Sequence, residues 1–95
     1  MGLDATANGV GETLNTAVGE NARATGGNDN TAVGANAAAG SAGNSAFGTG
    51  AQATNSDNNT AIGFDALANG TDGEGTAVGQ DARAQDENST ALGQG

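Results

Sequence analysis

A four-residue phrase dominates this chain of 95 residues: Thr or Ser, then Ala, then a large apolar residue, then Gly. Six copies occupy residues 16–19, 31–34, 45–48, 60–63, 76–79 and 90–93. The first five copies continue, two residues later, into an Ala-x-Ala tail, and residues 2–7 form the back half of a seventh copy. A short repeat in fixed register predicts a solenoid, in which each unit packs only on its neighbours and the surface is extended.

Large apolar side chains are scarce in this chain, which has 18 Gly but only two Phe, one Met and no Trp or Tyr. Such a composition is typical of disordered segments, because little burial is available to offset the loss of conformational entropy. The repeat argues against disorder, since the apolar residue and the Gly keep their register in all six copies. The same scarcity indicates that a lone compact monomer lacks sufficient core.

The charge and the missing residue types exclude several functions. The net charge is −9, Arg23 and Arg83 are the only basic residues, and this balance disfavours binding to nucleic acid or to anionic lipid. The absence of Cys and His removes disulfides, thiolate clusters and most transition-metal chemistry. No apolar run has the length of a membrane span, so we expect no direct membrane insertion by this segment.

Each repeat contains two positions that favour turns. The phrase ends at an anchor glycine in every copy, at Gly19, Gly34, Gly48, Gly63, Gly79 and Gly93. The residue two places later is always Asp, Asn or Gly, the types that tolerate a left-handed backbone. All length variation falls in the segments of 5 to 8 residues that separate the Ala-x-Ala tail from the next copy. Each unit is therefore predicted to be a strand, a tight turn, a second strand and a variable loop.

Units of this size can coil so that each lays its strands parallel to those of the unit before. Six steps at the inter-strand spacing of about 4.8 Å give a rod roughly 29 Å long. Alternation within the first strand places Thr and the apolar residue on one face and Ala on the other. The apolar residues then form one structural apolar stripe along the rod: Val18, Val33, Phe47, Ile62, Val78 and Leu92.

Two locations are open for the apolar stripe: the narrow interior of the coil, or an interface with other copies of the chain. The scarcity of large apolar residues favours the interface, because closed symmetry lets identical stripes meet on one axis. This reasoning does not separate a dimer from a trimer.

Phe64 and Leu67 add two apolar residues in one copy. We favour Phe64 filling a gap between chains over the two forming an exposed contact.

Three phrases of this chain are similar to a known repeat. Residues 30–34, 59–63 and 88–93 resemble the Asn-Ser-Val-Ala-Ile-Gly repeat of YadA-like head domains in trimeric autotransporter adhesins, and the resemblance extends over essentially the whole chain. It implies an all-β fold, a left-handed parallel β-roll (a solenoid) of about seven short coils, and an intertwined homotrimer. The chain departs from the family in having Thr or Ser where Val is frequent, and Gly75 where the fifth copy would have Asn.

The same resemblance implies a function. Family members are displayed on the surface of Gram-negative bacteria, on coiled-coil stalks anchored in the outer membrane, and attach to host matrix proteins or cells in virulence. We therefore expect an adhesin head segment whose partners are two identical chains and host extracellular matrix or cell-surface molecules. Because the chain begins and ends within a repeat, we expect residues 1–95 to be one head-repeat domain from a longer protein, with the anchor elsewhere. The alternative is a structural spacer that projects a separate binding tip.

A more distant alternative is an ice-binding solenoid. It would use the column of hydroxyl residues at the start of each phrase: Thr16, Thr31, Ser45, Thr60, Thr76 and Thr90. Ice-binding faces use two flat, exposed hydroxyl columns. Here the hydroxyl column shares its face with the apolar stripe, which we expect to turn it inward.

No enzyme, cofactor or metal site is predicted. A nucleophilic Ser would have neither His nor Lys as its base, because the chain contains neither residue. Carboxylate pairs remain at Asp72 with Glu74 and at Asp86 with Glu87, but they lie in Gly- and Asn-rich loops without the enclosed surroundings of a catalytic acid. Asp57, with Asp72 and Glu74, could hold an ion loosely, and solvated loop charge is the simpler interpretation.

Overall fold

Twelve short strands make up the computed structural model, which describes residues 2–9 and 14–95. The strands are β1 (Thr6–Ala7), β2 (Thr16–Val18), β3 (Arg23–Gly26), β4 (Thr31–Val33), β5 (Ala38–Ser41), β6 (Ser45–Phe47), β7 (Gln52–Ala53), β8 (Thr60–Ile62), β9 (Leu67–Ala68), β10 (Thr76–Val78), β11 (Arg83–Ala84) and β12 (Thr90–Leu92). Each four-residue phrase begins one even-numbered strand, and each odd-numbered strand begins at the middle residue of an Ala-x-Ala tail. Among the described residues there is no helix long and apolar enough to cross a membrane.

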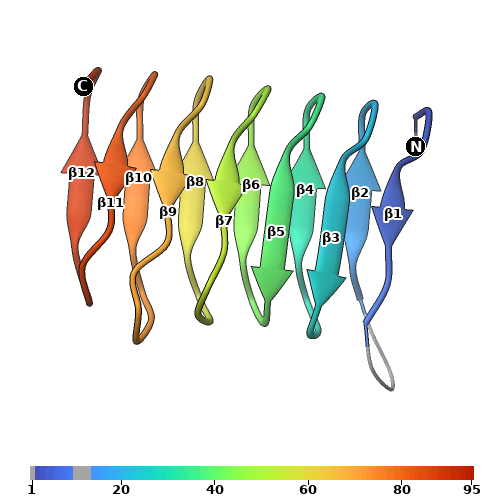
Figure 1. Ribbon diagram of the computed structural model, residues 1–95, viewed down its shortest axis with the longest axis horizontal. Coiled ribbons are helices and arrows are strands. Elements are labelled where there is room, and N and C mark those ends of the chain that lie inside the picture. The colour runs from blue at the N-terminus through green and yellow to red at the C-terminus, as the bar shows by residue number, and fades with distance from the viewer. Residues whose placement is uncertain (1, 10–13) are drawn as a thin grey trace.

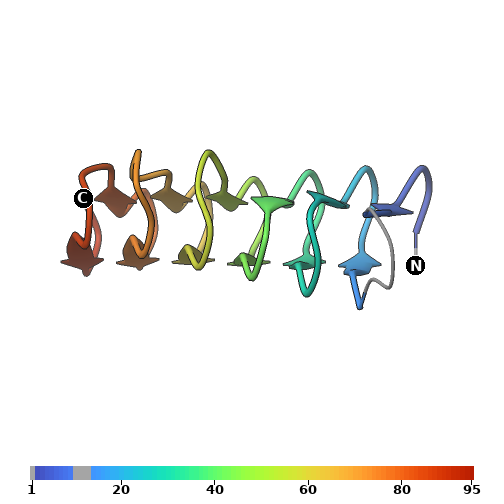
Figure 2. The same cartoon turned by 90° about the horizontal axis from the view of Figure 1, so that it is seen from below.

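The strands form two parallel β-sheets that face each other, and within each sheet the strands follow one another along the rod (Figures 1 and 2). The odd-numbered sheet has the order β1-β3-β5-β7-β9-β11, and the even-numbered sheet has the order β2-β4-β6-β8-β10-β12. Since successive strands alternate between the sheets, the chain makes five complete coils with half a coil at each end, which amounts to about six turns. The predicted β-solenoid is confirmed, and its longest extent of 31 Å agrees with the expected rod length.

The interior between the sheets is filled by alanine. Within the described part of the chain, every buried hydrophobic side chain is an Ala, and most of these alanines are fully inaccessible to solvent. In each even-numbered strand the central Ala points inward, as Ala46 and Ala61 do, while its two neighbours point outward. Methyl groups occupy little space, so the molecule is only 13 Å across its shortest axis.

The anchor glycines form a column in which backbones of successive coils approach closely. Gly63 has a φ of +130°, which side-chain-bearing residues rarely adopt. A Cβ at this position would lie 2.6 Å from the carbonyl oxygen of Gly79 in the next coil. Two residues beyond the anchor, Asn36 and Asp65 have φ values of 61° and 54°, in the left-handed region. The turn therefore needs Gly at the anchor and a type that tolerates the left-handed conformation two places later.

Replacing Gly63 with Ala should lower the free energy of unfolding by about 3 kcal/mol or more, because strain at positive φ adds to a backbone clash. Gly93→Ala is the matched control, since Gly93 has a φ of +98° but no heavy atom within 4 Å of its would-be Cβ. Urea unfolding of both variants measures the difference. Equal losses would show that the close approach between coils contributes nothing.

Candidate functional site

The apolar stripe lies on the outer face of the even-numbered sheet. Parallel pairing places its residues directly above one another, for example Val33 beside Phe47 and Phe47 beside Ile62. Exposed fractions are 41% for Val18, 39% for Phe47, 41% for Ile62 and 75% for Leu92, while Val33 and Val78 are half-buried. Of the two locations considered for the stripe, a single coil therefore places it outside its own interior.

The hydroxyl column lies on the same outer face. Thr60 pairs with Ser45 on one side and with Thr76 on the other, so the column is continuous along the sheet. Its members are exposed or half-buried in the single chain. In a single coil this column lies outside the interior, because alanine occupies the interior and alternation turns both neighbours of each alanine outward. The face thus combines a row of hydroxyls with a row of branched apolar side chains.

A ladder of asparagine side chains, which was not predicted, runs along the edge of the coils. Asn30, Asn44 and Asn59 are fully buried and precede the Thr or Ser of their phrases. The Asn30 Oδ1 accepts the backbone N–H of Asn44 at 2.9 Å, and the Asn44 Oδ1 accepts that of Asn59 at 2.6 Å. The ladder begins at Asn15, whose Oδ1 accepts the backbone N–H of Asn30. It ends at Asn59, whose Oδ1 accepts the backbone N–H of Gly75.

The amide nitrogens of the ladder fix the loops that connect the sheets. The Asn59 Nδ2 donates to the backbone oxygens of Thr54 and Ser56 at 3.0 and 2.9 Å, and the Asn44 Nδ2 donates to the same Ser56 oxygen at 2.9 Å. Each ladder residue therefore satisfies its own buried amide and a main-chain group of the next coil. The only signal in the sequence is the Asn before Thr or Ser, and this pattern does not reveal the contact between coils.

Asn44→Ala should lower the free energy of unfolding by about 2 kcal/mol, because the N–H of Asn59 would be left buried without an acceptor. The matched control is Asn28→Ala, which replaces an exposed Asn in a loop of the same type. Denaturant unfolding of the two variants checks this prediction. A loss for Asn28→Ala as large as that for Asn44→Ala would contradict the role of the ladder.

The outer face of the odd-numbered sheet carries a mixed column of side chains. Its members, one per coil, are Thr6, Arg23, Ala38, Gln52, Leu67 and Arg83. Both arginines are exposed, and Leu67 is half-buried. Phe64 lies in the turn before β9 and is 53% exposed. This face has no continuous apolar row and differs in character from the face of the even-numbered sheet.

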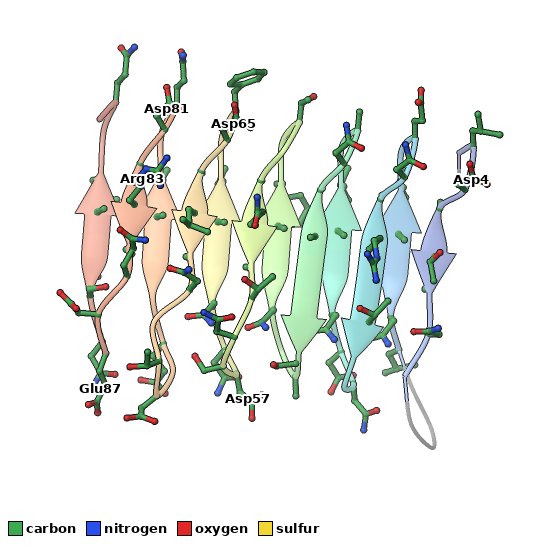
Figure 3. The ribbon with its side chains drawn as sticks, in the orientation of Figure 1. Asp4, Asp57, Asp65, Asp81, Arg83 and Glu87 are labelled. Atoms are coloured by element: carbon green, nitrogen blue, oxygen red, sulfur yellow. The ribbon has the colours of Figure 1, made fainter. Side chains whose placement is uncertain are left out.

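The acidic side chains that Figure 3 labels lie at the two edges of the rod. Figure 3 shows Asp4, Asp65 and Asp81 in the turns of one edge, and Asp57 and Glu87 in the loops of the other.

An open groove of about 660 Å³ lies between three loops at the second of these edges. Its lining is polar: Asn55, Ser56, Asp57, Asn58, Thr71, Asp72, Gly73, Glu74 and Asn88. Of the residues with a described position, no three carboxylates come together as metal ligands would.

Comparison with known families bears on the two last repeats. Residues 74–95 match the family model of the YadA head domain repeat in two copies. No curated protein and no solved structure gave a match. The matched family is an adhesin repeat and not an enzyme family, and its members assemble as trimers at the bacterial surface. The earlier copies pair with the two matched ones in the same sheet, as Thr60 does with Thr76. The match over residues 74–95 supports a YadA-like head domain of a trimeric autotransporter adhesin, and the earlier copies continue the matched repeats in the same register.

Proposed function

We propose that this chain is the head segment of an adhesin on the surface of a Gram-negative bacterium. It acts as a homotrimer and attaches the cell to host extracellular matrix proteins or cell-surface molecules. Regions of the protein outside this sequence hold it in the outer membrane. The observation that carries the proposal is a continuous outward apolar stripe on a coil in which, among the described residues, every buried hydrophobic side chain is alanine.

The apolar stripe favours assembly for an energetic reason. Burying apolar surface contributes roughly 25 cal/mol for each Å² removed from water, and an interior of methyl groups supplies little of this. The stripe is straight and regular because parallel pairing keeps its residues in register. Identical stripes on three chains can therefore meet along a three-fold axis and form the core that each chain lacks. The number three rests on the family, since the stripe by itself would also suit a dimer.

The substitution Ile62→Asp tests whether the stripe is buried in the assembled protein. In a trimer it would place three carboxylates together in an apolar core, which should cost about 4 kcal/mol or more per chain and prevent association. In an isolated coil the same change would cost little, because Ile62 is 41% exposed there. Sedimentation equilibrium and thermal unfolding, measured on the same samples, report both effects.

Arg83→Ala is the control for Ile62→Asp, since Arg83 lies on the opposite outer face and is exposed. We expect this variant to remain trimeric and to change stability by no more than about 0.5 kcal/mol. A stable monomer of the unmodified chain, or equal losses of stability in the two variants, would overturn the assembly proposal.

Host binding, in this proposal, uses the surfaces that the assembly leaves free. These are the outer face of the odd-numbered sheet, the turns and the acidic loops. Three copies of a regular surface suit weak contacts multiplied by valency, as attachment to a repetitive matrix requires. The steady spacing of the coils supports this, because parallel pairing places the outer residue of each coil one inter-strand spacing from that of the coil before.

Deleting residues 31–59 separates adhesion from a spacer role. The deletion joins Asn30 to Thr60, which restores the Asn-Thr pair of two ladder repeats, and removes two whole coils, or about 10 Å of rod. Made within the full-length adhesin, it should reduce binding of cells to immobilised matrix proteins if these coils carry contacts. Unchanged binding on a shorter fibre would show that the coils are a spacer.

The hydroxyl column keeps ice binding as a second candidate only for a single chain, because that column is exposed in the isolated coil. Assembly through the apolar stripe would cover it, since both rows lie on one face. The oligomeric state, which sedimentation equilibrium would give, therefore decides between adhesion and ice binding.

A further inference from the structure

Asn69 differs from the asparagines of the ladder in its hydrogen bonds. Its Oδ1 is buried, and it is the only buried side-chain nitrogen or oxygen without a partner among residues 2–9 and 14–95. By contrast, the ladder amides of Asn30 and Asn59 are held by donors and acceptors on both sides. Burying a carbonyl oxygen without a donor is costly. Because this oxygen has no hydrogen bond, no such bond opposes rotation of the Asn69 side chain.

The residue that follows Asn69 is also exceptional. After each buried ladder residue comes Thr31, Ser45 or Thr60, whose N–H donates to a backbone oxygen of the next coil at 2.8 to 2.9 Å. Gly70 follows Asn69, and within the described part of the chain its N–H has no hydrogen bond. Glycine has no side chain to hinder the approach of another group to its nitrogen.

The backbone around this pair is nevertheless held in place. The Asn55 Nδ2 donates to the main-chain oxygen of Asn69 at 3.3 Å, and the Ser56 Oγ donates to that of Gly70. The Asn69 N–H donates to the Ala84 oxygen at 3.0 Å. A fixed backbone with an unbonded side-chain amide next to an unbonded glycine nitrogen brings together the two groups that react in asparagine deamidation.

We propose that Asn69–Gly70 is a site of spontaneous deamidation in the folded protein. The Gly70 nitrogen loses its proton to solvent base and attacks the Asn69 Cγ, so that a C–N bond closes a five-membered succinimide. The side-chain nitrogen takes a proton and leaves as ammonia. Water then adds to either carbonyl of the ring and opens it, which gives aspartate or isoaspartate at position 69.

The product would alter the loop that begins at β9. A carboxylate replaces a neutral amide whose oxygen was already without a donor, and a buried charge is more costly than a buried carbonyl. It would also lie in the loop that carries Asp72 and Glu74, where like charges repel. Isoaspartate further inserts a carbon into the main chain and would displace the loop that lines the groove.

Incubation of the full chain at mildly alkaline pH, followed by peptide mass mapping and isoaspartate detection, tests the site. When each rate is divided by the rate of the same residue in urea, Asn69 should convert at least roughly thirtyfold faster than Asn44 or Asn59, whose side chains must first break at least two hydrogen bonds. The rate should rise with pH, since the attacking nitrogen must lose a proton. Asn69→Gln should abolish the signal at position 69, because its longer side chain closes a six-membered ring more slowly.

The pair Asn8–Gly9 serves as an internal reference, since it has the same dipeptide and both residues are exposed. The variant Asn8→Gln removes its contribution and isolates the signal of Asn69. The same samples unfolded in urea give the rate set by sequence alone. If Asn69 keeps its amide in the folded chain but converts in urea, the fold protects this site and the proposal is wrong.

Discussion

The close approach of two parallel sheets, which only alanine side chains permit, is the constraint on which the rest of this structure depends. An interior of methyl groups has no room for Val, Ile or Phe, so the large apolar residues lie on the outside. The coil is thin, and hydrogen bonds join each coil to the next along its whole described length. Backbone pairing supplies one set of these bonds, and the Asn30–Asn44–Asn59 ladder supplies another. In the proposed assembly, association through the exposed stripe would compensate for a core that one chain cannot provide.

Features that depend on neighbouring residues in the chain could be predicted from the sequence. Alternation placed Thr60 and Ile62 on one face and Ala61 on the other, and Gly with Asp or Asn two places later marked the turn. Alternation alone does not predict whether that face points into the coil or out of it, because it says only which residues share a face. The scarcity of large apolar residues favoured the outside, although such residues usually fill interiors. The buried ladder was missed because each Asn bonds to residues 14 to 16 positions away.

The ladder also explains why the loops can vary while the coils stay regular. The amides of Asn30 and Asn59 hold the bases of their own loops, and the amide of Asn44 holds the loop of the next coil, so other loop residues can change in number without moving the strands. Gly75 ends this series, and a Cβ there would lie 3.0 Å from the Asn59 Oδ1. The loop before Gly75 is one residue longer than its predecessor and carries Asp72 and Glu74. The open groove, which Asp72 and Glu74 help to line, therefore lies beside the end of the ladder at Gly75.

The two outer faces have different chemistry because the two strands of each coil have different patterns. The even-numbered strands expose two residues for each one they bury, and one of the two is always large and apolar. The odd-numbered strands expose one residue between two buried alanines, and that residue ranges from Arg23 to Leu67. A face on which identical chains pack needs the same type of side chain in every coil. A face that contacts only solvent or another molecule tolerates different side chains from coil to coil. Under the proposed function, the repeat would separate assembly from contact with other molecules within a unit of 14 to 17 residues.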